Sequence, residues 1–200
     1  MKLFTTSEAR DARKWWRALA APVEQNDDTR GERRPDTGAL ARLRRARTPI
    51  EAMMHAEAID LVLAIAPDGP PQAQERAAGL AALLAHVRGD DPERSVAGRL
   101  GGHDPDIRIM KPARFRKLML AAPGEERLTA FRRAIRQLSS TVNVADLATA
   151  WLFWDHPMKG NRLRAEWMFR YVGANQSDTR GPATEDVQID PTEAIEKTTR

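Results

Sequence analysis

Apolar side chains recur at intervals of three and four residues through most of this 200-residue chain. That spacing places them on one face of an α-helix, whereas a half-buried strand alternates at every second residue. Proline and glycine interrupt the pattern repeatedly, as in the run Pro67–Pro71 and at Pro123-Gly124, and both residues end helices. The sequence therefore predicts an all-α bundle of about eight or nine helices, without a convincing strand or an internal repeat.

The positions of the expected helices follow from these stripes and breaks. They cover about 6–21, 38–47, 49–66, 72–88, 95–100, 112–122, 125–139, 144–155 and 162–172. Thr6 or Ser7 can cap the first helix, and Leu63 belongs to the expected inner stripe of 49–66. Asn143 can cap the helix that follows it, with Asp146 as a short partner in a capping box.

Composition divides the chain into five segments. Residues 1–21 form the expected N-terminal helix of the bundle, and 22–37, polar with proline and glycine, are expected to be a flexible loop. A helical sub-bundle is predicted for 38–100 and a basic helical sub-bundle for 101–175. The segment 176–200 is polar and acidic without periodicity, which predicts a disordered tail.

Composition also excludes several classes of protein. No apolar run is long enough to span a bilayer, and the N-terminus lacks the apolar core of a secretory signal. The absence of cysteine removes disulfide scaffolds, cysteine zinc sites and thiol catalysis. We therefore expect a soluble, cytoplasmic protein that needs no cofactor and contacts no membrane.

The search for catalytic residues gives one candidate pair. The chain has no HExxH, no GxSxG and no glycine-rich phosphate loop. His103 and Asp104 are adjacent, as are metal ligands of helical metal-dependent phosphohydrolases, but such a site needs further ligands on neighbouring helices. Because the pair lies in the loop sequence 101–105, a turn in which Asp104 accepts a backbone amide is the preferred interpretation. His55 and His86 are interpreted as ordinary, partly buried or surface histidines, so neither an enzyme nor a metal site is predicted.

Positive charge is concentrated in one part of the chain. Residues 99–136 hold ten basic and four acidic side chains, and 26 of the 32 basic residues of the chain are arginines, whose planar group binds phosphate with two hydrogen bonds. Three expected helices carry cations beside or opposite their apolar stripes: Arg42, Arg44, Arg45 and Arg47 on the second, Arg114, Arg116 and Lys117 on 112–122, and Arg132, Arg133 and Arg136 on 125–139. On neighbouring helices, these cations would form a stripe suited to a nucleic-acid backbone.

Other interpretations of these features stay open. Each arginine can lie on a solvated face and pair with a carboxylate such as Glu125 or Glu126. The tryptophans fall on apolar helix faces, so packing is preferred over base stacking. A helical DNA-binding transcriptional regulator is a further alternative, but no compact three-helix unit with a polar recognition helix is evident. Sequence-independent contact with the backbone is therefore favoured.

Seven motifs occur in a fixed order along residues 10–173: WWRAL (15–19), LARLRRA (40–46), SVAGRL (95–100), ARFRKLMLAA (113–122), LTAFRRAIRQL (128–138), VADLATAWLFWD (144–155) and RAEWMFRYV (164–172). In this order, the chain resembles the CasB family, the small subunit of the type I-E CRISPR surveillance complex called Cascade. The segment 22–37 and the acidic extension after Asn175 depart from the family pattern.

The resemblance implies an all-helical, non-enzymatic subunit of which the complex holds two copies. Its implied partners are CRISPR RNA, target DNA and the backbone and large subunits of Cascade. Its basic surface would follow the guide–target hybrid and hold the displaced strand, which stabilises the R-loop by backbone contacts. The basic positions carried over are Arg42, Arg44, Arg45, Arg99, Arg114, Arg116, Lys117, Arg132 and Arg133, and Arg136 joins them from the helix pattern alone. Arg45, Arg114, Arg132 and Arg133 are the leading candidates.

Overall fold

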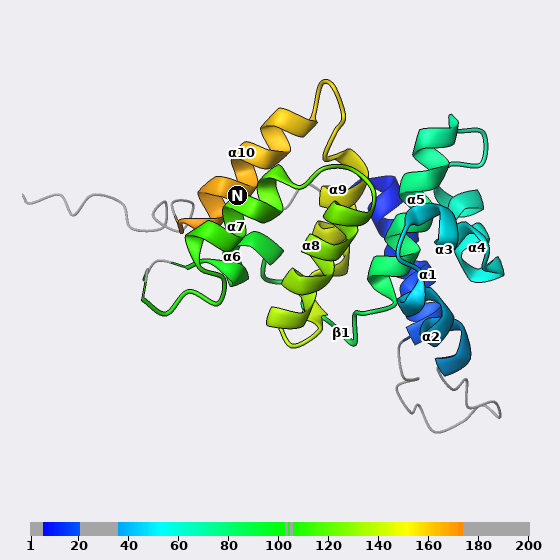
Figure 1. Cartoon of the computed structure of the whole chain (residues 1–200), viewed down its shortest axis with the longest axis horizontal. Coiled ribbons are helices and arrows are strands. Elements are labelled where there is room, and N and C mark those ends of the chain that lie inside the picture. Colours follow the sequence, from blue (N-terminus) through cyan, green and yellow to red (C-terminus); the bar gives the residue numbers. More distant parts are fainter. Residues whose placement is uncertain (1–5, 21–35, 103, 105, 174–200) are drawn as a thin grey trace, which may run out of the picture.

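Ten helices make up most of the described part of the chain, which comprises residues 6–20, 36–102, 104 and 106–173 of this computed structural model. In chain order they are α1 (Ser7–Ala20), α2 (Thr37–Arg45), α3 (Pro49–Met53), α4 (Ala56–Ile65), α5 (Pro71–Leu84), α6 (Val96–Leu100), α7 (Pro112–Leu120), α8 (Glu125–Gln137), α9 (Val144–Phe153) and α10 (Gly160–Tyr171) (Figure 1). The all-α prediction is confirmed. None of these helices is long and apolar enough to cross a membrane.

A two-residue parallel pairing, which the sequence did not indicate, joins the chain after α5 to the chain after α8. In it, β1 (Gly89–Asp90) lies beside β2 (Thr141–Val142), with Gly89 opposite Thr141. A Cβ atom on Gly89 would lie 2.9 Å from Oγ1 of Thr141, so glycine permits the close approach. Two residues are too few to show a strand period, which is why the sequence pattern missed this pairing.

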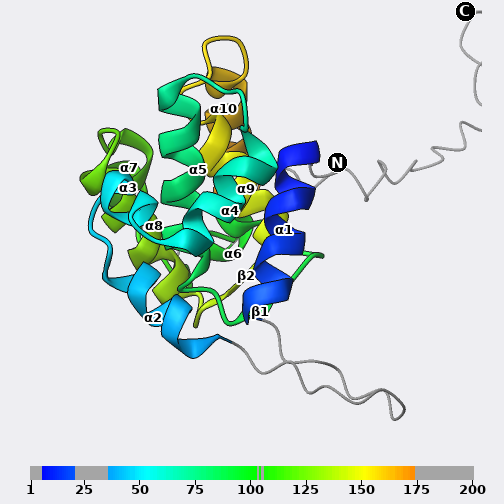
Figure 2. The same ribbon diagram turned by 90° about the vertical axis from the view of Figure 1, so that its right-hand side faces the viewer.

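Helices α5 and α9 form the centre of the core. Residues 77–84 of α5 are all buried, and α5 packs against α3, α4, α8 and α9. Gly79 lets α9 approach closely, since a Cβ atom there would lie 2.7 Å from the Trp151 ring. Helix α9 also packs against α1, and Figure 2 shows α9 between α5 and α1. A helix that is buried on most sides carries apolar or small residues nearly all round, as residues 77–84 of α5 and most of α9 do.

The single helix expected over 49–66 is wrong, because the structure divides it into α3 and α4. His55 has an extended backbone (φ −112°, ψ 131°) and is the N-cap residue immediately before α4. The break allows both short helices to cover α5, with Ala52 of α3 and Leu61 of α4 fully buried. The change of direction also turns Leu63 outward, where it is 57% exposed instead of facing the core. This extra break raises the number of helices above eight or nine.

Side-chain caps begin helices where the sequence predicts them, with one difference. The hydroxyl of Thr6 accepts the amide of Ala9, and Asn143 accepts the amide of Asp146. Asp146 does not complete a capping box. Instead it accepts the amide of Val96 and a hydrogen bond from Arg170, so it ties α9 to α6 and α10. Tertiary contacts have therefore displaced the local cap.

The tryptophans pack in the core, as expected. Trp154 and Trp167 are almost fully buried and meet edge to face, with Phe131 of α8 against both. Trp16 and Trp151 are buried as well and donate their indole N–H groups to backbone carbonyls. Buried rings of this kind are not available for stacking on bases.

Two predicted segments lie outside the described residues. They are the loop 22–37, except for residues 36 and 37 at the start of α2, and the tail 176–200. The division into sub-bundles 38–100 and 101–175 stays a prediction.

Candidate nucleic-acid interface

Helices α7 and α8 pack together by their apolar faces and leave most of their cations outside. Phe115 and Leu118 of α7 and Phe131 and Ile135 of α8 are buried. On an α-helix, residues three or four apart share a face. Most cations of the two helices therefore project from the opposite, solvent-facing sides, where Arg114, Arg116, Lys117, Arg133 and Arg136 are exposed. Arg127 of α8 is buried instead and pairs with Asp155.

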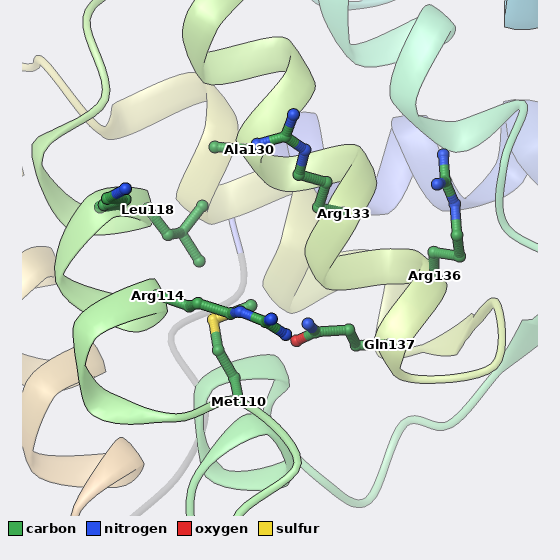
Figure 3. A pocket seen from close by; sticks show the side chains of 8 residues that line it. Met110, Arg114, Leu118, Ala130, Arg133, Arg136 and Gln137 are labelled. Carbon is green, nitrogen blue, oxygen red and sulfur yellow. The ribbon is translucent and has the colours of Figure 1, made fainter.

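A groove of about 420 Å³ lies between these two helices, and we call it the α7–α8 groove. Figure 3 shows Arg114 on one side and Arg133 and Arg136 on the other. Its lining consists of Met110, Arg114, Lys117, Leu118, Ala130, Arg133, Arg136 and Gln137. The structure thus brings together three arginines and one lysine from two of the three helices that sequence reasoning selected.

The four cations of the groove keep their charge available. Among the described residues, none of them has a carboxylate oxygen within 4 Å. Glu126, one of the carboxylates expected to pair with α8, accepts the backbone amide of Ala122 instead. A site lined by one sign of charge attracts polyanions and raises their rate of association.

Arg132 and Arg44 differ from these cations, because each donates a hydrogen bond to a backbone carbonyl at the end of another helix. Arg132 donates a hydrogen bond to the carbonyl of Ala46, immediately after α2, and burial lowers the pKa of its guanidinium. Arg44 donates to the carbonyl of Ala85, at the end of α5, with a distance of 2.6 Å. Both side chains are half-buried. Arg132 links α8 to the end of α2, Arg44 links α2 to the end of α5, and their role in binding nucleic acid stays a prediction.

His86, expected to be an ordinary histidine, lies among three arginines. Its Nε2 atom is buried without a hydrogen-bond partner. Burial, followed by the positive charges of Arg132, Arg44 and Arg136, lowers the pKa of His86 to about 4. The ring is therefore neutral near pH 7 and adds no charge to the crowded cations. No local sequence pattern indicates this cluster, because its members come from three separate segments.

A second basic hollow lies next to α2. It has a volume of about 390 Å³, and its lining comprises Arg42, Arg45, Ala46, Glu51, Met54 and His55. Arg42 forms an ion pair with Glu57, whereas Arg45 is exposed and has no carboxylate within 4 Å in the described segments. Helices α2, α8 and α7 lie along the same side of the molecule (Figure 2). Arg132, the sequence neighbour of the groove residue Arg133, donates to the carbonyl of Ala46 in the lining of this second hollow.

Two further predicted residues lie away from the groove lining. Arg99 of α6 is mostly buried, donates to the carbonyl of Thr141 and lies 3.5 Å from a carboxylate oxygen of Asp91. Arg116 is exposed on α7 but does not line the groove. A role of Arg99 and Arg116 in binding nucleic acid stays a prediction.

The candidate metal pair is described only in part. Asp104 accepts the backbone amide of Asp106 at 2.8 Å, the turn contact that the sequence predicts. His103 lies outside the described residues. Within the described ranges, no group of three or more metal-binding side chains occurs.

Comparison with protein families gives a match over most of the chain. The family model described as CRISPR-associated protein Cse2 matches residues 39–171, which is more than half of the chain. No curated protein and no solved structure matches. The matched segment runs from α2 to the last residue of α10 and contains the whole α7–α8 groove. The chain therefore belongs to the CRISPR-associated Cse2 family, the small subunit of the type I-E Cascade complex.

Proposed function

We propose that this chain is a non-catalytic subunit that stabilises the R-loop of Cascade by sequence-independent contacts to the backbones of the target and displaced strands. Membership of the family makes it a CRISPR Cascade subunit. Under the proposal, its partners are CRISPR RNA, target DNA, the backbone and large subunits and a second copy of itself. Guide pairing then selects the sequence, and the subunit contributes binding energy for the separated strands.

One observation carries the proposal: the α7–α8 groove gathers four cations that are not neutralised by carboxylates of the described segments. Phosphate contacts supply most of the affinity in sequence-independent binding, and each neutralised phosphate releases counterions. Binding by these cations should therefore be weak, should ignore base sequence and should fall steeply with salt. The sequence pattern, in which no compact three-helix unit with a polar recognition helix is evident, agrees with this mode of binding.

The test is fluorescence anisotropy of labelled single strands and duplexes of several unrelated sequences, titrated with the full chain over a range of salt concentrations. We expect similar affinities across sequences and a marked loss in the double variant Arg133→Ala/Arg136→Ala. The matched control is Arg10→Ala/Lys14→Ala, which removes two exposed cations from α1, on the other side of the molecule in Figure 2. Equal losses in both double variants would refute a role for the groove. Tight binding to one duplex sequence would favour a transcriptional regulator instead.

A further inference from the structure

The α7–α8 groove has an apolar floor as well as charged walls. Met110 and Leu118, only 3% and 2% exposed, line it together with the half-buried Ala130. A site that bound phosphate alone would not need such a floor, because phosphate is fully polar. A nucleobase, by contrast, combines an apolar face with polar edges, and bases pack well on apolar and aromatic side chains.

One residue of the groove lining carries a buried polar atom next to the end of Arg114 (Figure 3). Oε1 of Gln137 is buried and has no hydrogen-bond partner. Figure 3 shows the Gln137 side chain extending toward the end of Arg114. An unsatisfied buried acceptor destabilises a protein unless a ligand or water supplies a donor. Every nucleobase has an N–H donor on its Watson–Crick edge, so any base can satisfy this atom once the end of Arg114 turns toward a phosphate.

The groove is also held in shape before any ligand arrives. The ring of Tyr171 stacks on Phe115 with centroids 3.8 Å apart, and its hydroxyl donates to the carbonyl of Met110 at 2.7 Å. The amide of Met110 in turn donates to the carbonyl of Leu100. A pre-formed site loses less entropy when it binds its ligand. The volume of about 420 Å³ is sufficient for one base between the cations of the rim.

We propose that the α7–α8 groove takes up one unpaired base of a single strand, with the base on Met110, Leu118 and Ala130, its N–H donating to Oε1 of Gln137, and the flanking phosphates on the surrounding cations. In a duplex, the Watson–Crick edge is already paired, so the site selects single-stranded nucleic acid without selecting a sequence. This inference rests on the proposed function, and it identifies the substrate class of the groove as an unpaired strand.

The test compares two fluorescein-labelled strands of equal length and charge, one of oligothymidine and one of abasic tetrahydrofuran units, by anisotropy with the full chain at low salt. We expect the thymidine strand to bind about fivefold more tightly, the size of one buried hydrogen bond with apolar contact. Gln137→Leu removes the acceptor at similar volume, and Ala130→Met fills the floor. Both variants should lower affinity for oligothymidine toward that for the abasic strand, and leave the abasic affinity unchanged. Circular dichroism verifies that both remain folded.

Three outcomes contradict the inference, and they are distinguishable. Equal binding of both strands by the unmodified chain would overturn the base site and leave the phosphate contacts intact. A preference for thymidine that survives both substitutions would show that the base lies elsewhere. Failure to bind either strand would overturn the proposed function itself. Arg133→Ala serves as the matched control, because it should weaken both strands by the same factor.

Discussion

Acidification should weaken the folded state through His86, and the direction follows from its surroundings. Burial and the charges of Arg132, Arg44 and Arg136 lower its pKa to about 4 from an ordinary value of 6.5. As the pH falls, the unfolded chain therefore takes up this proton before the folded chain does. The contribution of His86 is complete above pH 6.5 and is lost as the pH falls from there to about 4.

The size of the effect can be worked out from that shift. Without screening, a pKa depressed to about 4 lowers the free energy of unfolding by about 2 kcal/mol at pH 5. His86 is only partly buried, and solvent screening reduces this to about 1 kcal/mol. The measurement is urea unfolding followed by tryptophan fluorescence near neutral pH and near pH 5, at constant ionic strength. The reference is His86→Gln, which keeps a polar side chain of similar size but carries no titrating group.

Subtracting the two pH profiles removes the carboxylates and the other histidines, which titrate equally in both proteins. We expect the unmodified chain to lose about 1 kcal/mol more than His86→Gln on acidification. If the two profiles fall in parallel, protonation of His86 costs nothing, and the reasoning about three arginines around a neutral ring is refuted.

Three other predictions concern the core and the groove. Asp146→Ala leaves the buried Arg170 with only its 3.5 Å ion pair to Glu166 and leaves the amide of Val96 without an acceptor, so it should lower the urea-derived stability by about 2–3 kcal/mol; a loss below about 1 kcal/mol would contradict this. Gly79→Ala should destabilise by about 1–2 kcal/mol despite its better helix propensity, since the new Cβ atom lies 2.7 Å from the rigid Trp151 ring; an increase in melting temperature would show that α9 moves freely. Replacing Arg133 and Arg136 by alanine should flatten the plot of log affinity against log salt for a single strand by about 1.4, because each lost phosphate contact contributes about 0.7. An unchanged slope would place the contacts elsewhere.

Much of the fold could be predicted from local patterns. Helical spacing of apolar residues gives the fold class, because an amphipathic helix must bury its stripe. Proline, glycine and capping side chains give most helix ends, since they act on the backbone within a few residues. The same spacing predicts which cations of α7 and α8 project outward, as Arg114 and Arg133 do.

The errors share a cause, which is competition from distant parts of the chain. The break at His55 lets α3 and α4 both cover α5, so packing overrides a continuous helical stripe. Asp146 leaves its local cap for Val96 and Arg170, fifty and 24 residues away in the sequence. Neither choice is visible in a window of a few residues.

The candidate site divides in the same way. The sequence by itself determined that the chain is helical, that its cations concentrate in 99–136 and that its motifs follow the family order, because these depend on composition and local spacing. Only the tertiary structure decided which cations line one groove and which donate hydrogen bonds to backbone carbonyls of other helices. Arg133 and Arg132 are neighbours in the sequence, yet Arg133 lines the α7–α8 groove, whereas Arg132 donates a hydrogen bond to the carbonyl of Ala46. Adjacent residues on a helix point about 100° apart, so the packing of the helix against its neighbours determines what each one meets.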